Sequence, residues 1–263
     1  MEILYGLHPV EEALKAGKRR FDHVCVARER QDLRLQKIVD ICREIGVNLR
    51  VEPREHLTHM AKTAAHQGVV AVVRAKTLLD LEDLLEPEDG KRFLLALDGV
   101  EDPQNLGALL RTADGAGVTG IVMTERRSAP LSPVAIKASA GAAEHVRMAR
   151  VVNLVRSLEE IKKQNIWCLG LDERGTMDYD EFDYTREFVL VLGNEGHGLH
   201  DLVRRTCDHL MRIPMAGAVS SLNVSAAGAA VLYEAARQRR AALRPAAAKA
   251  EEPVRKKQKG LGS

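Results

Sequence analysis

The chain of 263 residues has few aromatic residues, few cysteines and no long apolar segment. One Trp, four Tyr and four Phe are too few for the stacking surfaces of proteins that bind single-stranded nucleic acid. The four cysteines (Cys25, Cys42, Cys168, Cys207) include no C-x-x-C pair, which disfavours a zinc or disulfide framework. No apolar run reaches the roughly 18 residues of a membrane span, and Met1–His8 lacks a signal-peptide core. These absences predict a cytoplasmic protein with reduced thiols and no membrane segment.

A large excess of one charge is also absent, because the formal net charge is only +2. Six basic and two acidic residues give residues 241–263 a charge of +4, so the preceding part sums to −2. A nearly neutral body excludes a protein that binds nucleic acid over its whole surface. Any contact with RNA must therefore use local basic patches or the basic tail.

What the first 75 residues do contain is the pattern of a small α/β unit. Hydrophobic spacing, Pro9 near a helix start and glycines after the periodic segments predict two helices, and short apolar runs predict three strands. The predicted helices are 9–17 and 30–46, and the predicted strands are 21–26, 47–51 and 69–73. Residues 76–90 contain Pro87 and six acidic residues, and they are predicted to be a linker with one short acidic helix.

From residue 91 to residue 240, apolar strands alternate with helical segments. The predicted strands are 93–97, 120–123, 166–171 and 188–192, and the predicted helices are 106–116, 134–143, 154–164, 199–206 and 224–239. This alternation is typical of a mostly parallel sheet with helices on both faces. The remaining residues, 241–263, are rich in Ala, Lys and Pro and are predicted to be a disordered basic tail.

Three polar, glycine-containing loops stand beside these predicted elements, at 98–105, 193–198 and 217–223. The third loop precedes a helix, so its backbone amides and the hydroxyls of Ser220 and Ser221 can hold a polar group. Three such loops in one domain predict a single composite site.

The same segments carry a resemblance to a known family. Leu97–Ala113, Phe188–Leu199 and Ile213–Ser225 resemble, in this order, the three signature motifs of the SpoU branch of the SPOUT RNA methyltransferases. The resemblance extends from Met1 to about Arg240 and is strongest to the bacterial enzymes that methylate a guanosine of 23S ribosomal RNA. It implies transfer of a methyl group from S-adenosyl-L-methionine to a ribose 2'-hydroxyl.

The resemblance also implies structural features that periodicity and spacing do not predict. These are a deep trefoil knot that holds the cofactor, an L30e-like RNA-recognition domain in residues 1–75, and a homodimer. The implied partner is large-subunit ribosomal RNA, with a guanosine of the peptidyl-transferase P loop as the expected target.

Carried over by motif, the catalytic positions are Arg111, Asn105, Glu195, Ser221 and Asn223. Because an arginine stays protonated, we expect Arg111 to bind a phosphate and the developing oxyanion rather than to accept a proton. From the residues alone, Arg111 could equally lie on a solvated helix face or pair with Asp114. Asn105 and Asn223 could simply cap helices, and Glu195 could be a solvated turn residue.

The cofactor positions carried over by motif are Gly193, Ile213, Met215 and Leu222, of which the last three would otherwise be read as core residues. The cluster Lys18, Arg19 and Arg20 could contact RNA phosphates or form an ordinary solvated turn. The pairs His197/His200 and His56/His59 lack a third ligand, so no metal is expected.

Three other functions are weighed against this prediction. A ribose methyltransferase acting on tRNA is disfavoured, because compact members with that substrate usually lack the N-terminal unit. A non-catalytic RNA-binding assembly factor would bind RNA but no cofactor. The segment Gly115–Gly120 matches G-x-G-x-x-G, but it follows a helix and precedes a strand, so a nicotinamide oxidoreductase is remote.

Overall fold

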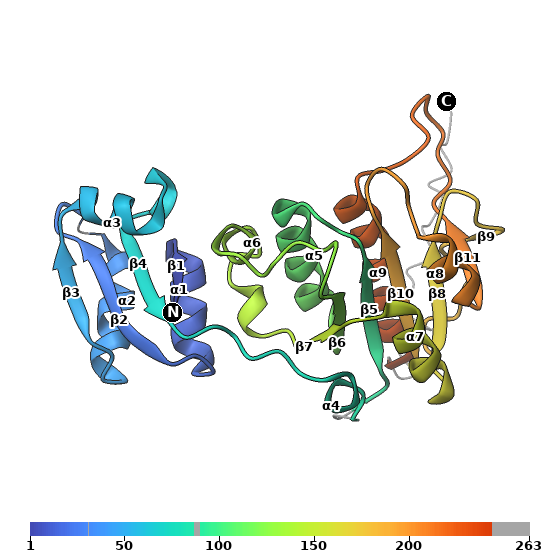
Figure 1. Cartoon of the computed structure of the whole chain (residues 1–263), viewed down its shortest axis with the longest axis horizontal. Coiled ribbons are helices and arrows are strands. Elements are labelled where there is room, and N and C mark those ends of the chain that lie inside the picture. Colours follow the sequence, from blue (N-terminus) through green and yellow to red (C-terminus); the bar gives the residue numbers. More distant parts are fainter. Residues whose placement is uncertain (31, 87–89, 244–263) are drawn as a thin grey trace, which may run out of the picture.

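The computed structural model describes residues 1–30, 32–86 and 90–243. Two β-sheets lie side by side along the molecule and are joined by a segment that runs from β4 to α4 (Figure 1). Pro87 and residues 244–263 of the predicted basic tail lie outside the described residues. Residues 241–243, which were predicted to be disordered, instead form the last part of a helix, so that boundary was wrong by three residues.

The N-terminal part is built around a mixed four-stranded sheet in the order β1-β4-β2-β3. β4 is antiparallel to β1 and β2, whereas β2 and β3 are parallel. The strands are β1 (Glu2–Tyr5), β2 (Phe21–Ala27), β3 (Leu49–Glu52) and β4 (Val69–Val73), and the helices are α1 (Leu7–Ala16), α2 (Leu33–Glu44) and α3 (Arg54–Ala61). The elements predicted from the sequence are present, and β1 and α3 are additional.

The C-terminal part contains a seven-stranded sheet in the order β7-β6-β5-β10-β8-β11-β9, in which all neighbours are parallel. The strands are β5 (Phe93–Asp98), β6 (Gly120–Thr124), β7 (Met148–Val151), β8 (Trp167–Leu171), β9 (Met177–Asp178), β10 (Phe188–Gly193) and β11 (His209–Arg212). The helices are α4 (Leu81–Leu85), α5 (Pro103–Ala116), α6 (Pro133–Ala138), α7 (Leu154–Lys163), α8 (Asp201–Thr206) and α9 (Val224–Leu243). The predicted parallel sheet is confirmed.

Alternating side chains of the central strands pack on opposite faces of this sheet. Phe93, Leu95 and Leu97 of β5 join the buried cluster that contains residues of α5, α6 and α9. Leu94 and Ala96 of the same strand join a second cluster with residues of α4, α7 and α8. Successive side chains of a strand point to opposite faces of the sheet, and here the side chains on both faces are buried. Helices therefore cover both faces, as predicted.

Two local predictions in this part were wrong in detail. The predicted helix 134–143 is interrupted: α6 ends at Ala138 and a short 3₁₀ turn, η2 (Ala142–Glu144), follows Gly141, whose φ of 95° is left-handed. Helix α5 begins at Pro103, and its N-cap is Asp102, whose carboxylate accepts from the amide of Gln104. Asn105 therefore lies inside the helix and does not cap it, because the aspartate–proline pair supplies an earlier start.

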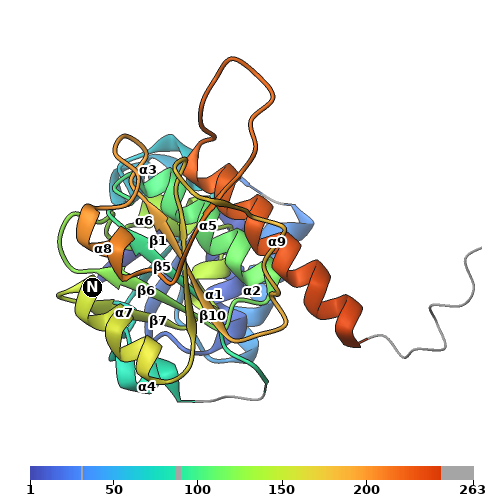
Figure 2. The ribbon, with the colours of Figure 1, turned by 90° about the vertical axis from the view of Figure 1, so that its right-hand side faces the viewer.

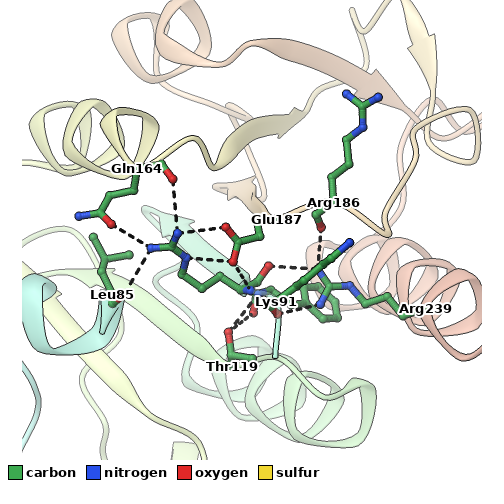
Figure 3. A network of polar contacts seen from close by, with 9 residues as sticks. Leu85, Lys91, Thr119, Gln164, Arg186, Glu187 and Arg239 are labelled. Atoms are coloured by element: carbon green, nitrogen blue, oxygen red, sulfur yellow. Dashed lines mark hydrogen bonds and ion pairs between the residues drawn. The ribbon is translucent and has the colours of Figure 1, made fainter. Parts of the chain in front are cut away.

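The last helix, α9, lies beside α5, and the loop that precedes it projects from the molecule (Figure 2). Near its end, the Arg239 guanidinium donates to four backbone carbonyl oxygens over 2.7–3.0 Å, those of Lys91 and Arg186 among them (Figure 3). It also lies over the rings of Phe93 and Phe188. The carbonyls belong to Tyr184, Lys91, Arg92 and Arg186. Burial lowers the pKa of Arg239. One side chain thus fastens α9 to the segments that enter β5 and β10.

Replacing Arg239 by methionine is expected to lower the free energy of unfolding by about 3 kcal/mol, because four carbonyls lose a charged donor. Urea unfolding followed by circular dichroism measures this change. The exposed neighbour Arg240, replaced in the same way, is the control and should leave the transition unchanged. Equal midpoints for the two variants would contradict the fastening role.

Candidate active site

The three polar loops meet at the carboxyl edge of the parallel sheet. Gly193 at the end of β10 pairs in register with Asp98 at the end of β5, and Leu192 pairs with Leu171 at the end of β8. β11 lies beside β8 and leads into the loop before α9. Because β10 is inserted between β5 and β8, segments far apart in the sequence converge at one edge, where α/β proteins bind their ligands.

A pocket of about 350 Å³ opens at this edge. Its walls include all four predicted cofactor positions, which are Gly193, Ile213, Met215 and Leu222. Met215 is 36% exposed and Leu222 is 42% exposed, so the alternative reading of these two residues as core is wrong. Apolar side chains that remain accessible in a concave site are suited to a ligand with an apolar surface.

The structure adds pocket residues that sequence reasoning missed. Leu171 at the end of β8, and Asp172, Glu173 and Arg174 directly after it, line the pocket. No recognised motif includes them. The rule that ligands bind beyond the carboxyl ends of parallel strands would have found them, had the position of β8 beside β10 been known.

The loop after β10 is held tightly against the loop after β5. The backbones of Asn194 and Gly198 exchange hydrogen bonds of 3.0 and 2.9 Å, and the Asn194 side chain donates to the Gly99 carbonyl over 2.8 Å. The buried Asp98 carboxylate accepts from the amide of His200 over 2.8 Å and contacts its Nδ1 over 2.9 Å. His200 therefore connects the loop after β10 to the end of β5 through Asp98.

Side chains from all three loops form one polar chain. Asn105 donates from Nδ2 to Glu195 Oε1 over 2.7 Å, and its Oδ1 accepts from Asn223 Nδ2 over 3.1 Å. Asn223 also accepts from the backbone amide and the hydroxyl of Ser225, so it caps α9 as well. Glu195 and Ser221 line the pocket. The structure therefore brings the three predicted loops together, with Asn105 joining Glu195 and Asn223.

Arg111 is placed differently from the other four predicted catalytic residues. It lies six residues after Asn105 on α5, which is about 9 Å along the axis and about 120° around the helix. Its side chain is exposed, does not line the pocket, and makes no hydrogen bond or ion pair with the residues that the structure describes. No pair between Arg111 and Asp114 forms in the described part of the chain, so the guanidinium is available to an external anion.

The predicted basic cluster divides into two groups. Lys18 and Arg20 are exposed, as a phosphate contact requires. Arg19 is 8% exposed and is bound by Glu144 and Glu2, so its assignment to RNA binding was wrong. A charged neighbourhood in sequence does not distinguish a solvated arginine from one that pairs with a distant carboxylate.

Within the described ranges, no group of three or more His, Cys, Asp or Glu side chains is arranged to hold a metal ion. The same part of the chain has no helix that is long and apolar enough to cross a membrane.

Comparisons with known proteins agree with this geometry. Residues 92–233 match the SpoU rRNA Methylase family, and residues 3–79 match the family described as RNA 2'-O ribose methyltransferase substrate binding. The chain is 43% identical to the 23S rRNA (guanosine-2'-O-)-methyltransferase RlmB of Vibrio vulnificus, covering 90% of this chain and 97% of that protein. It is 41% identical to the protein of that name from Escherichia coli K12, covering 90% and 99%.

Among solved structures, the SpoU methyltransferase AviRb from Streptomyces viridochromogenes, in complex with AdoMet, has a TM-score of 0.78 and 27% identity to this chain. The match covers 91% of this chain and 90% of that one. Together with the family match over more than half of the sequence, this similarity shows that the chain belongs to the SpoU rRNA methylase family.

Proposed function

We propose that the protein transfers a methyl group from S-adenosyl-L-methionine to the ribose 2'-hydroxyl of a guanosine in 23S ribosomal RNA. The observation that carries this proposal is the pocket at the carboxyl edge, with the chain Glu195–Asn105–Asn223 at its side. The activity named for the relatives in Vibrio vulnificus and Escherichia coli supports the reaction and the substrate.

The pocket fits the cofactor chemically. Leu171, Ile213 and Leu222 supply apolar walls for an adenine ring, and the backbone from 193 to 198 supplies amide and carbonyl edges. When bound, S-adenosyl-L-methionine supplies a methyl carbon that its sulfonium has already activated.

The residues of the chain must then place the ribose oxygen in line with that carbon. Alignment alone can contribute roughly 7–11 kcal/mol to lowering the barrier. Asn105, held between Glu195 and Asn223, offers a rigid polar surface, and Ser221 adds a hydroxyl at the pocket wall. We assign to Arg111 the binding of the neighbouring phosphate and of the charge that develops on the 2'-oxygen.

Replacing Asn105 by alanine is expected to lower kcat about tenfold, because Glu195 and Asn223 lose the amide that joins them. The dissociation constant of S-adenosyl-L-methionine should change less than twofold, since Asn105 does not line the pocket. Single-turnover kinetics and calorimetry measure the two quantities. Gln104→Ala, at the exposed neighbouring position, is the control; an equal loss in both variants would contradict the role of Asn105.

For the RNA, we propose that residues 1–75 form an L30e-like recognition unit and that residues 76–90 link it to the methyltransferase unit. Lys18 and Arg20, which are both exposed, are the proposed phosphate contacts. The proposed target is a guanosine of the peptidyl-transferase P loop, and the proposed location of the protein is the cytoplasm. The match of residues 3–79 to a substrate-binding family supports an RNA-recognition role and disfavours the compact tRNA-modifying alternative.

We further propose a trefoil knot and a homodimer. The loops after β10 and β11 both line the same pocket. A knot, in which one of these segments passes through a loop formed by the other, would place them together in this way. Gly228 of α9 packs closely on Leu109 and Leu192 of the same chain, whereas the small residues Ala226, Ala229 and Ala230 retain exposed surface that a second copy could approach closely. A crystal structure tracing residues 188–230 tests the knot, and light scattering tests the dimer: the mass of a single chain would contradict it.

The function is tested by incubating the purified protein with labelled S-adenosyl-L-methionine and undermodified ribosomal RNA, and by mapping ribose methylation. Methylation of one guanosine in 23S RNA is the expected result. Transfer to tRNA alone would contradict the substrate, and RNA binding without cofactor binding would favour the assembly-factor alternative.

A further inference from the structure

The contact between the N-terminal and C-terminal parts is centred on a buried ion pair. The Arg19 guanidinium, in the turn between α1 and β2, donates from Nε and Nη2 to the two oxygens of Glu144 over 2.8 and 3.0 Å. Both side chains are 1% exposed. Glu144 ends η2 in the C-terminal part, so the pair joins residues that are 125 positions apart in the sequence.

The Nη1 group of Arg19 is also bound. Nη1 donates to Glu2 Oε2 over 2.7 Å and to the Arg74 carbonyl over 3.3 Å. An arginine held in a plane by two carboxylates and a carbonyl has one orientation, since its five N–H donors form a rigid fork. Such a contact is directional, whereas apolar packing has no preferred direction.

Further polar contacts surround the pair. Glu12 on α1 contacts His145 Nε2 over 2.9 Å, and Lys137 donates to the Ala65 carbonyl over 2.6 Å. Lys76, whose pKa burial lowers to about 8, donates to the carbonyls of Ala143 and Val146.

Backbone packing is equally close. A Cβ built on Gly141 would lie 2.7 Å from the Cβ of Glu12 and 3.2 Å from the carbonyl oxygen of His8. Only glycine therefore allows the turn before η2 to approach α1 this closely.

The connecting segment is itself attached to the C-terminal part. The Leu79 amide donates to the Met148 carbonyl over 2.9 Å, and Leu79 forms a parallel β-bridge with Ala149 of β7. The apolar side chains of α4 (Leu81, Leu84 and Leu85) are buried in the cluster below the sheet. From β4 to α4 the chain runs along the C-terminal part (Figure 1).

We infer that Arg19 and Glu144 are positioning residues, which lock the RNA-recognition unit at a fixed displacement from the methyl-transfer pocket. The inference rests on the proposed function for the identity of the substrate. RNA gripped by the N-terminal part then reaches the pocket as a tethered group, whose effective concentration depends on a rigid connection. Loosening the pair should weaken productive RNA binding and leave the cofactor pocket intact.

The test compares three variants of the full-length protein. Glu144→Gln removes the carboxylate charge from the pair between the two parts and leaves the contact of Arg19 with Glu2 in place, whereas Arg19→Met removes the guanidinium itself. Glu187→Gln is the matched control, because Glu187 binds the Arg92 guanidinium through both oxygens but within the C-terminal part (Figure 3). The measurements are the KM for a ribosomal RNA fragment, kcat, the cofactor Kd, and the interdomain distance distribution from small-angle X-ray scattering.

In Glu144→Gln and Arg19→Met, the KM for RNA is expected to rise about tenfold, with the cofactor Kd within twofold of the unmodified protein and a broadened distance distribution. Glu187→Gln should change the thermal midpoint only. An unchanged KM and distance distribution in the first two variants, or an equal rise of KM in the control, would overturn the inference.

A double variant, Arg19→Met with Glu144→Met, separates positioning from stability if a single variant unfolds. Two apolar side chains leave no buried charge at positions 19 and 144, and Glu2, which also loses Arg19, is 34% exposed and stays solvated, so the fold should be retained. Because a contact between two methionine side chains is not directional, the KM for RNA should stay raised in the double variant. A KM equal to that of the unmodified protein would overturn the inference. The distance distribution from small-angle X-ray scattering does not depend on activity, so it tests whether Arg19 and Glu144 hold the two parts together even if the RNA substrate has been assigned wrongly.

Discussion

Arg111→Ala is expected to lower the rate of methyl transfer by two to three orders of magnitude, about the loss seen when one preorganised stabiliser of developing charge is removed. The guanidinium is exposed on α5 and makes no hydrogen bond or ion pair with the described residues, so its loss breaks no polar contact within them. The cofactor Kd and the thermal midpoint should therefore be unchanged. Single-turnover assays at saturating RNA and cofactor measure the chemical step.

Two further variants sharpen this prediction. Arg111→Lys retains the charge but loses the planar fork, so it should recover only part of the rate. Arg156→Ala, at an exposed arginine on α7 that does not line the pocket, controls for the removal of a positive charge. If Arg111→Ala instead raised only the KM for RNA, Arg111 would be a binding residue and its role in the transition state would be wrong.

Gly193→Ala is expected to weaken binding of the cofactor by about ten- to a hundredfold. A Cβ at position 193 would lie 2.2 Å from the carbonyl carbon of Gly198 and 2.5 Å from the amide nitrogen of Leu199. The obstacle is backbone, so the loop must move away from the pocket that it lines. Overpacking of this kind costs about 1–3 kcal/mol, which corresponds to the stated range of affinity.

Gly196→Ala is a matched control in the same loop. The nearest atom to a Cβ at position 196 is Asn194 Oδ1 at 3.5 Å, an ordinary contact. Titration calorimetry with S-adenosyl-L-methionine should give a Kd close to that of the unmodified protein. Equal affinities for the two alanine variants would show that the loop after β10 does not shape the cofactor site.

Local patterns were sufficient for most elements of the fold. The apolar run of residues 188–192 and the periodic segment 154–164 predict β10 and α7, because burial on both faces or on one face leaves a recognisable spacing. β1, β7, β9 and β11 were missed, since two to four residues leave little room for a spacing to stand out, although β3 was predicted at the same length of four. The start of α5 was misplaced because Asn105 and Asp102 are both good capping residues, and sequence alone did not rank them.

The sequence by itself determined the residue types of the site: an asparagine, a glutamate and a second asparagine in three loops beside strand ends, together with apolar residues before the last helix. Only the tertiary structure decided which of them meet. Asn105 joins Glu195 and Asn223 because β10 is inserted between β5 and β8, and strand order depends on long-range packing that no local pattern records. Arg19 is the opposite case, since its sequence neighbours predict a phosphate contact, whereas its Nε and Nη2 donate to a carboxylate 125 positions away. Burial of a charge depends on the partner that the fold brings to it, and that partner is not visible in the surrounding sequence.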